Sequence, residues 1–439
     1  MGEMTQEPEP IEPRPEEVPG PVGRRAFWVL AAIIFLAGAA LRIVPSASFK
    51  AVGFDEVLYR TYLLMLDKKG LGDYASLTEA YLADQEKEDS ITKLPPTRFL
   101  YIFSGWVWKK VAFGDAPPVN LKQPNAAEED PALVSLHRIS CLFSVLFLAL
   151  SGVAATRMAG ARIGLATMAL VATSPVQLHM SQHALIDGFL AFWGTLSLWT
   201  LWENLRRPNQ PAWLAAHAVV LALMVMTKEN SFFVYCSLCG VMAVVLFTKA
   251  GAQIGKVTPR LAFVSVVGPL VGVLLLMSLA GGLGNFIDTY RLLVAKASNL
   301  EYAIKTGDGP WHRYIVDLML ATPIVTCLAI AALFSVMRNR PAYVYLALFV
   351  AFSYLIMCNV RFGMNLRYST IWDLPLAALA AGQIAAVADF FGRRSPLVLA
   401  LLVFGTGLYG MRQYQQFTVE SGMYEMVTEG LLRSQKILK

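Results

Sequence analysis

Long apolar runs separated by short polar segments make up most of the chain. Each run is close to the length of the ~20-residue helix that crosses the hydrocarbon core of a bilayer. The shortest run, 163–178, contains Ser174-Pro175, so we expect a kink there. The pattern predicts an all-α, polytopic membrane protein with about 11 transmembrane helices. The runs lie near residues 26–44, 133–155, 163–178, 182–203, 212–228, 231–248, 261–281, 314–336, 342–359, 367–388 and 395–412.

One long polar segment, 45–131, interrupts this pattern after the first run. Within it, residues 99–113 are apolar, but the stretch is short for a bilayer span and ends in Lys109-Lys110. Such a stretch is typical of an amphipathic helix that lies on the membrane surface. Residues 55–69 have the same character. We therefore expect two juxtamembrane helices in this segment and no additional span.

Composition supports a membrane protein and adds detail at the N-terminus. Hydrophobic residues are 56% and charged residues 15% of the sequence, whereas a soluble chain carries about a quarter charged residues. Residues 1–25 are rich in Pro and Glu, which predicts a disordered tail. The run 26–44 is longer than the apolar core of a cleaved signal peptide, so we expect a retained anchor.

The cysteines give no sign of a disulfide framework or a metal site. All five fall inside apolar runs, which indicates free thiols. Cys236-Ser-Leu-Cys239 has the spacing of a redox or zinc pair, but it lies in a predicted span and no second pair accompanies it.

The distribution of Lys and Arg predicts how the helices are oriented. With the N-terminus in the cytosol, the short cytoplasmic segments hold thirteen Lys and Arg and the short outside loops hold three. The net charge of +6 is therefore orienting charge and does not indicate a nucleic-acid partner. We expect the loops 45–131 and 282–313 and a short tail, 413–439, on the outer or luminal side, and we expect a bacterial inner membrane.

Two acidic sites stand out against the apolar background. Asp55-Glu56 follow the first run closely, where a carboxylate can accept a proton from a hydroxyl nucleophile. The alternative is that they cap the helix that begins at Val57. Asp187 lies in the apolar stretch HALIDGFLAFW, where an ionisable residue is unfavourable and marks a functional site by default. Its alternative role is a structural hydrogen bond between helices.

A histidine pair precedes Asp187. His179, His183 and Asp187 are spaced i, i+4 and i+8, so a continuous helix would place them on one face. That face is compatible with a metal, and it equally suits a pair of interfacial hydrogen-bonding groups. We expect no metal, with the alternative left open.

Polar and cationic residues also lie at the outer ends of the predicted helices. Single cations at an interface often only reach toward lipid headgroups, whereas several that converge with acids form a phosphate pocket. The candidates are Lys93, Arg98, Arg138, Lys228, His312, Arg367 and Tyr368.

Several features occur in a fixed order along the chain. They are Asp55-Glu56 after the first span, the Lys-x-Pro-Pro turn (93–96) before an aromatic helix ending in Phe113-Gly114, Arg138 opening the second span, Ala-Arg-Ile-Gly (161–164) ahead of Ser174-Pro175, Asp187 within an apolar stretch, and Arg367-Tyr368 before a Pro-containing span. This order resembles the GT-C superfamily of integral-membrane glycosyltransferases, in particular the protein O-mannosyltransferases and bacterial aminoarabinose transferases. The likeness covers roughly residues 26–385.

The resemblance implies a GT-C module over residues 26–412 and transfer of a sugar from a polyprenyl- or dolichyl-phosphate donor to a hydroxyl acceptor on a protein, lipid or glycan. It implies Asp55 as the general base, with Glu56 and Asp187 as supporting acids. Donor-phosphate binding would fall to Lys93, Arg98, Arg138 and Arg367, and substrate positioning to His183, Lys228, His312 and Tyr368. A lipid monophosphate is a workable leaving group once cations stabilise its charge, so we expect neither a cofactor nor a divalent metal.

Two alternatives come from other functional classes. A membrane transporter or lipid flippase would show internal repeats and acids near the middle of the bilayer, and the sequence shows no clear repeat. A non-catalytic GT-C-like subunit would not need the acids, so Asp55, Glu56 and Asp187 favour an enzyme.

Overall fold

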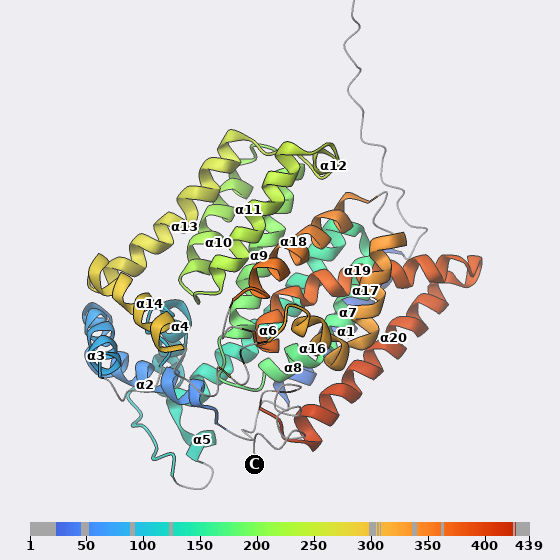
Figure 1. Ribbon diagram of the computed structural model, residues 1–439. Coiled ribbons are helices and arrows are strands. Elements are labelled where there is room, and N and C mark those ends of the chain that lie inside the picture. Colours follow the sequence, from blue (N-terminus) through green and yellow to red (C-terminus); the bar gives the residue numbers. More distant parts are fainter. Residues whose placement is uncertain are drawn as a thin grey trace, which may run out of the picture.

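A computed structural model describes residues 23–44, 52–87, 93–122, 126–297, 304, 307, 309–335, 340–360, 364–424 and 426. Within these ranges the chain is helical and contains no strand (Figure 1), which confirms the all-α class. Most of the predicted disordered tail, 1–25, lies outside the described residues. The last part of the predicted tail 413–439 also lies outside them.

The eleven apolar runs all form helices. These are α1 (Arg24–Ile43), α6 (Pro131–Ala159), α7 (Ala161–Ala172), α8 (Pro175–Met180), α9 (Asp187–Arg206), α10 (Pro211–Val225), α11 (Ser231–Phe247), α13 (Pro259–Leu279), α16 (Arg313–Ala321), α17 (Pro323–Ser335), α18 (Pro341–Met357), the 3₁₀-helix η4 (Leu366–Trp372), α19 (Asp373–Asp389) and α20 (Ser395–Tyr414).

Length and composition support an integral membrane protein. Among the described residues, five helical stretches are long and apolar enough to cross a membrane, and five shorter apolar helices accompany them. The five long stretches are Arg25–Ile43, Pro131–Ala159, Pro259–Leu279, Leu366–Asp389 and Gly392–Glu420. The count of about 11 spans stays a prediction.

Proline and turn residues interrupt several predicted runs. The kink expected at Ser174-Pro175 is a full break between α7 and α8. A second break separates α16 from α17 at Thr322-Pro323. Both new helices begin at proline, which lacks the N–H donor that a helix interior needs but fits a first helical position. The run 182–203 starts later than predicted, because α9 begins only at Asp187.

Burial distinguishes central helices from peripheral ones. In its most apolar window, α6 has 61% of its residues buried and the η4–α19 stretch has 72%. The corresponding shares are 17% for both α1 and the stretch that contains α20. The first two therefore form the core, and the last two present apolar side chains to the surroundings, as expected of helices that face lipid.

Close helix contacts hold one side of the bundle together. α10 packs on α13, where Gly268 and Gly272 lie against the backbone of Ala218 and Ala222. A Cβ added at Gly268 would come within 2.6 Å of the Ala218 carbonyl oxygen. Small residues that let helix backbones approach in this way are typical of membrane interfaces.

A fully buried arginine fixes the break between α7 and α8. Arg42, near the end of α1, donates to the carbonyls of Val171 (3.0 Å) and Ala172 (3.1 Å) at the end of α7. It also donates to the Ser144 hydroxyl at 2.9 Å. Because carbonyls at a helix end lack intrahelical donors, Arg42 satisfies groups that would otherwise be buried without partners.

Shorter helices cover one end of the bundle, at the bottom and lower left of Figure 1. They include the two predicted surface helices, now α2 (Phe54–Lys69) and α4 (Phe99–Phe113). The others are η2 (Leu71–Asp73), α3 (Ala75–Gln85), α5 (Ala126–Glu129) and α14 (Leu283–Ala297). The π-helix η6 (Gln415–Glu420) continues from the end of α20, and α12 (Lys249–Ala252) and η5 (Gly392–Arg394) lie elsewhere.

Ion pairs hold α2 in place at this end. Lys109 and Lys110 of α4 bind Asp67 near the end of α2, at 2.7 and 2.8 Å. Arg60 in the middle of α2 binds Asp130, which caps α6, at 2.8 Å. These contacts fix the helix whose first turn carries the acids Asp55 and Glu56.

Candidate active site

Four segments meet at the end of the bundle covered by α2. They are the first turn of α2, the first turn of α9, the turn between α10 and α11, and the 3₁₀-helix η4; Arg98, directly before α4, joins them from a fifth segment. Each brings charged side chains to the meeting point, which we call the charged cluster. It consists of Asp55, Asp187, Lys228, Glu229, Arg98 and Arg367.

The centre of the charged cluster is a chain of ion pairs. Arg367 binds Asp55 at 2.8 Å and lies 3.6 Å from Asp187. Lys228 binds the other oxygen of Asp187 at 2.6 Å. Asp187 and Lys228 are buried, whereas the Asp55 side chain keeps 16% of its surface exposed. Asp55 is therefore the most exposed member of this chain of ion pairs, followed by Arg367 at 10%.

Local structure explains how these side chains reach one another. Asn365 accepts from the Arg367 backbone N–H at 3.0 Å and so caps η4, the turn that presents Arg367 and Tyr368. The Thr370 hydroxyl donates to the Asp187 carbonyl at 3.3 Å and ties η4 to the start of α9. Asp187 occupies the first turn of α9, where the helix dipole favours an acid.

The Tyr368 ring makes cation–π contacts with two of the cations. The Lys228 ammonium lies 4.1 Å from the centre of the Tyr368 ring. The Arg367 guanidinium lies 5.4 Å from the same centre. Cation–π contacts of this kind hold cations without neutralising them, so Tyr368 orders both groups and leaves their charge available.

A second ion pair borders the first. Arg98 donates from Nε and Nη2 to the two oxygens of Glu229, and from Nη1 to the Tyr59 hydroxyl. Burial raises the pKa of Tyr59, so its hydroxyl stays protonated. Burial alone would raise the pKa of Glu229, but the Arg98 guanidinium outweighs it and holds that pKa below its usual range. The Leu100 backbone N–H donates to the Met226 carbonyl at 2.9 Å and fixes α4 beside the α10–α11 turn.

Glu56 has a mainly structural setting. One of its oxygens accepts from the Gly53 backbone N–H at 2.6 Å, which caps α2. The other accepts from the Ala184 backbone N–H at 2.6 Å and lies 3.4 Å from the His183 ring. Glu56 is fully buried and joins the start of α2 to the turn before α9. The capping alternative thus fits Glu56 better than Asp55.

Three predicted site residues lie away from the charged cluster. Lys93 binds Asp84 of α3 at 2.7 Å and lowers the pKa of that acid. His312 is exposed and stacks edge-on against Trp311. Arg138 is half-buried and makes no ion pair with any described residue. It lies one turn before Cys141, whose thiol approaches the Arg42 carbonyl at 3.7 Å, so Arg138 lies on the side of α6 that faces the end of α1.

The helical face expected for His179, His183 and Asp187 does not exist. α8 ends at Met180 and α9 begins at Asp187, so a turn separates the histidines from the acid. Asp187 binds Lys228, while the His179 ring bonds to the Tyr424 carbonyl at 2.7 Å. Among the described residues, no three His, Cys, Asp or Glu side chains are grouped to hold a metal. The break at Ser174-Pro175 and the turn that follows it account for the difference.

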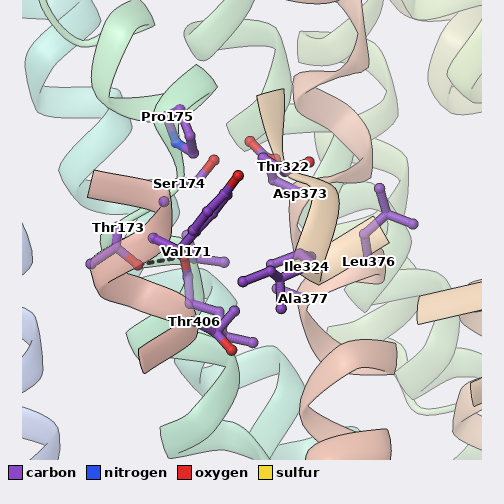
Figure 2. A pocket seen from close by; sticks show the side chains of 14 residues that line it. Val171, Thr173, Ser174, Pro175, Thr322, Ile324, Asp373, Leu376, Ala377 and Thr406 are labelled. Atoms are coloured by element: carbon purple, nitrogen blue, oxygen red, sulfur yellow. Dashed lines mark hydrogen bonds between the residues drawn. The ribbon is translucent and has the colours of Figure 1, made fainter. Parts of the chain in front are cut away.

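The described chain also has a pocket between α7, α8, α17, α19 and α20. Figure 2 shows Ser174 and Pro175, at the break between α7 and α8, across from Thr322 and Asp373. Leu376, Ala377 and residues of α20 such as Thr406 complete its walls, which include no Lys or Arg. Without a cation it does not suit a phosphate group, and it is separate from the charged cluster.

Sequence reasoning gave no role to two members of the site. Glu229 directly follows Lys228, and Tyr59 falls within the predicted helix 55–69. The signal for Glu229 is the sequence Lys228-Glu229 at the junction of two apolar runs. Tyr59 lies one helical turn after Asp55, so it shares that face of α2.

The helical bundle, with acids and cations gathered at one end, agrees with the resemblance to the GT-C superfamily drawn from the sequence. Residues 52–280, just over half of the chain, match the family described as dolichyl-phosphate-mannose-protein mannosyltransferase. The chain belongs to this family, which confirms the resemblance drawn from the sequence. The match includes Asp55, Asp187 and Lys228 and ends before η4. The comparison with curated proteins found no match.

Solved structures share the fold at low identity. An oligosaccharyltransferase from Archaeoglobus fulgidus in its apo form has a TM-score of 0.57 at 14% identity, over 89% of this chain and 56% of that one. The archaeal oligosaccharyltransferase AglB from the same organism, in complex with an inhibitory peptide and a dolichol-phosphate, has 0.55 at 14%, over 88% and 56%. ArnT from Cupriavidus metallidurans bound to undecaprenyl phosphate has 0.51 at 14%, over 88% and 69%. The chain spans just over half the length of the oligosaccharyltransferases.

Proposed function

We propose that the protein is a glycosyltransferase that moves a sugar from a polyprenyl- or dolichyl-phosphate donor to a hydroxyl acceptor. The observation that carries the proposal is the setting of Asp55. One of its oxygens binds Arg367, and within the described residues the other has no hydrogen-bond partner. A partly exposed carboxylate beside buried cations suits a base that works next to a phosphate. Membership of the mannosyltransferase family supports the same reaction class.

In the proposed reaction, Asp55 takes the proton of the acceptor hydroxyl as its oxygen attacks the anomeric carbon. The bond between that carbon and the phosphate oxygen breaks, and its electron pair leaves with the lipid phosphate. A single displacement of this kind inverts the anomeric centre. Asp187 stays ionised between Lys228 and Arg367 and holds both cations toward the reacting phosphate.

Charge balance explains why the charged cluster suits a phosphate. Three acids, Asp55, Asp187 and Glu229, are matched by the three cations Arg98, Lys228 and Arg367. When Asp55 takes the acceptor proton, the cluster gains one net positive charge at the moment the leaving phosphate gains one negative charge. Cations placed beforehand stabilise such developing charge strongly.

The cations take different parts in this proposal. Lys228 and Arg367 face the donor phosphate, ordered by Tyr368. Arg98 already donates hydrogen bonds to Glu229 and Tyr59. In this proposal it contributes its positive charge from a fixed place and does not bind the phosphate directly. Arg138, which has no described ion-pair partner, meets the phosphate as the lipid enters beside α1. Lys93 is bound to Asp84, and His312 is exposed. In this proposal neither residue binds the donor phosphate.

We infer one GT-C module over residues 26–412, with the charged cluster on the outer or luminal side and the N-terminus in the cytosol. Labelling of single cysteines tests this orientation. In a variant without native cysteines, Glu79→Cys on α3 is expected to react with an impermeant thiol reagent added outside intact cells. Asn209→Cys, exposed at the α9–α10 turn, is expected to react only after the membrane is opened. Labelling of both from one side contradicts the orientation.

A transfer assay tests the reaction class. The purified protein, given a polyprenyl-phosphate mannose or aminoarabinose and an acceptor mixture, is expected to release one polyprenyl phosphate for each sugar transferred. A flippase would move the donor between leaflets and leave that bond intact. Because Lys228 and Arg367 supply the positive charge, we expect the same rate in excess chelator. Loss of activity in chelator, restored by one divalent ion, contradicts the metal-free mechanism.

A further inference from the structure

The end of the chain returns to the first turn of α2. After α20, residues 415–424, which we call the return segment, pass along α8 near the bottom of Figure 1. The Thr418 hydroxyl lies 3.3 Å from His179 Nδ1, and the Tyr424 carbonyl lies 2.7 Å from His179 Nε2. Since a carbonyl only accepts, Nε2 carries the proton and Nδ1 accepts from Thr418. Burial lowers the pKa of His179 to about 3, so the ring stays neutral in this role.

The Tyr424 ring lies between His183 and the cap of α2. It meets the His183 ring edge-on, with the ring centres 4.9 Å apart, and His183 lies against His179 at 4.7 Å. On its other side it abuts Gly53, where an added Cβ would lie 2.1 Å from the Tyr424 hydroxyl oxygen. Glycine at this position is therefore required by the ring.

Both neighbours of Tyr424 connect directly to Glu56. Gly53 donates its backbone N–H to one Glu56 oxygen, and His183 lies 3.4 Å from the other. Asp55 precedes Glu56 in the same helical turn. A ring that packs on Gly53 and His183 therefore restricts the turn from which the Asp55 carboxylate projects.

We propose that Tyr424 is a positioning residue, which fixes the first turn of α2 so that Asp55 meets the acceptor hydroxyl. The inference rests on the proposed role of Asp55 as the base. Tyr424 lies outside the family match, which ends at residue 280.

Kinetics of Tyr424 variants test the proposal. Tyr424→Ala is expected to lower kcat about 10–100-fold with KM for the donor unchanged, because a base misplaced by about an ångström loses rate while the phosphate-binding cations stay in place. Tyr424→Phe keeps the ring and is expected to retain most of the activity. The matched control is Tyr409→Ala, which removes a tyrosine of α20 that lies away from the charged cluster. This variant is expected to leave kcat unchanged. A rise in donor KM with normal kcat in Tyr424→Ala overturns the proposal.

A double variant and a labelling experiment separate this inference from the role of Asp55. In an Asp55→Asn background, Tyr424→Ala is expected to add no further loss, because neighbours that act through one group are not additive. Full additivity overturns the positioning role. Independently of any catalysis, Asp55→Cys is expected to react several-fold faster with a thiol reagent when Tyr424→Ala is also present. If Asp55→Cys reacts equally fast with and without Tyr424→Ala, the inference is overturned even if Asp55 is the base. If Asp55→Asn stays active while Tyr424→Ala speeds the labelling of Asp55→Cys, only the proposed function is overturned.

Discussion

Asp55→Asn is expected to lower the transfer rate by on the order of 10²–10⁴-fold, the usual loss when a general base is removed. Asparagine keeps the size of the side chain and an oxygen that can face Arg367, but it has no carboxylate to take the acceptor proton. Because the substitution releases Arg367 from an anion, we expect binding of a polyprenyl phosphate to be unchanged or tighter. Turnover, thermal unfolding and lipid binding, measured together, check each part of this expectation.

The stability of the Asp55→Asn protein decides between catalysis and capping. Asn and Asp cap helices comparably, and a partly exposed ion pair contributes at most about 1 kcal/mol. The unfolding temperature should therefore hardly move. Asp73→Asn, which removes an exposed acid just after the other end of α2, 4.0 Å from Lys69, is the matched control and should leave turnover near that of the native protein. Normal turnover in a stable Asp55→Asn protein would transfer the role of base to another acid.

Lys228→Met is expected to give the largest loss of stability among the site variants. It removes the buried partner that binds Asp187 at 2.6 Å and leaves that carboxylate with Arg367 at 3.6 Å. Breaking a buried ion pair from one side typically costs about 3–5 kcal/mol. We expect a marked fall in the unfolding temperature together with loss of transfer, since the same ammonium faces the donor phosphate.

Two further variants show whether the buried charge is the cause. In Lys228→Met with Asp187→Asn, no unpaired carboxylate remains, so we expect part of the lost stability to return while transfer stays lost. Lys110→Met breaks a pair whose lysine side chain is 35% exposed, and such pairs contribute about 0–1 kcal/mol. A single Lys228→Met variant as stable as Lys110→Met contradicts the buried-pair account.

The hydrophobic pattern predicted the fold class well because lipid imposes a simple rule. A helix in hydrocarbon satisfies its backbone hydrogen bonds within its own segment, so a long apolar run predicts a helix. The two helices predicted within the segment 45–131 are present as α2 and α4, and their place on the membrane surface stays a prediction. The pattern did not show that the run 182–203 begins with a turn, because the residues of that turn are nearly as apolar as the helix that follows.

The candidate site could be predicted only in part. The sequence indicates Asp187 as a candidate because a lone acid in an apolar run is unfavourable. It indicates Asp55 because that acid follows a predicted span. Which cation binds which acid depends on contacts between distant segments, such as Arg367 with Asp55, and no local pattern carries that information. The same holds for Arg98, whose charge is matched by Glu229, and for the approach of Tyr424 to Gly53.

The most direct test of the account is an experimental structure of the protein with a bound polyprenyl phosphate. The account predicts the phosphate within about 4 Å of Lys228 and Arg367, the range in which charge-assisted contacts form, with Asp55 beside it and the lipid chain leaving between helices. A phosphate bound away from the charged cluster, with Lys228 and Arg367 still paired only to Asp187 and Asp55, would contradict it.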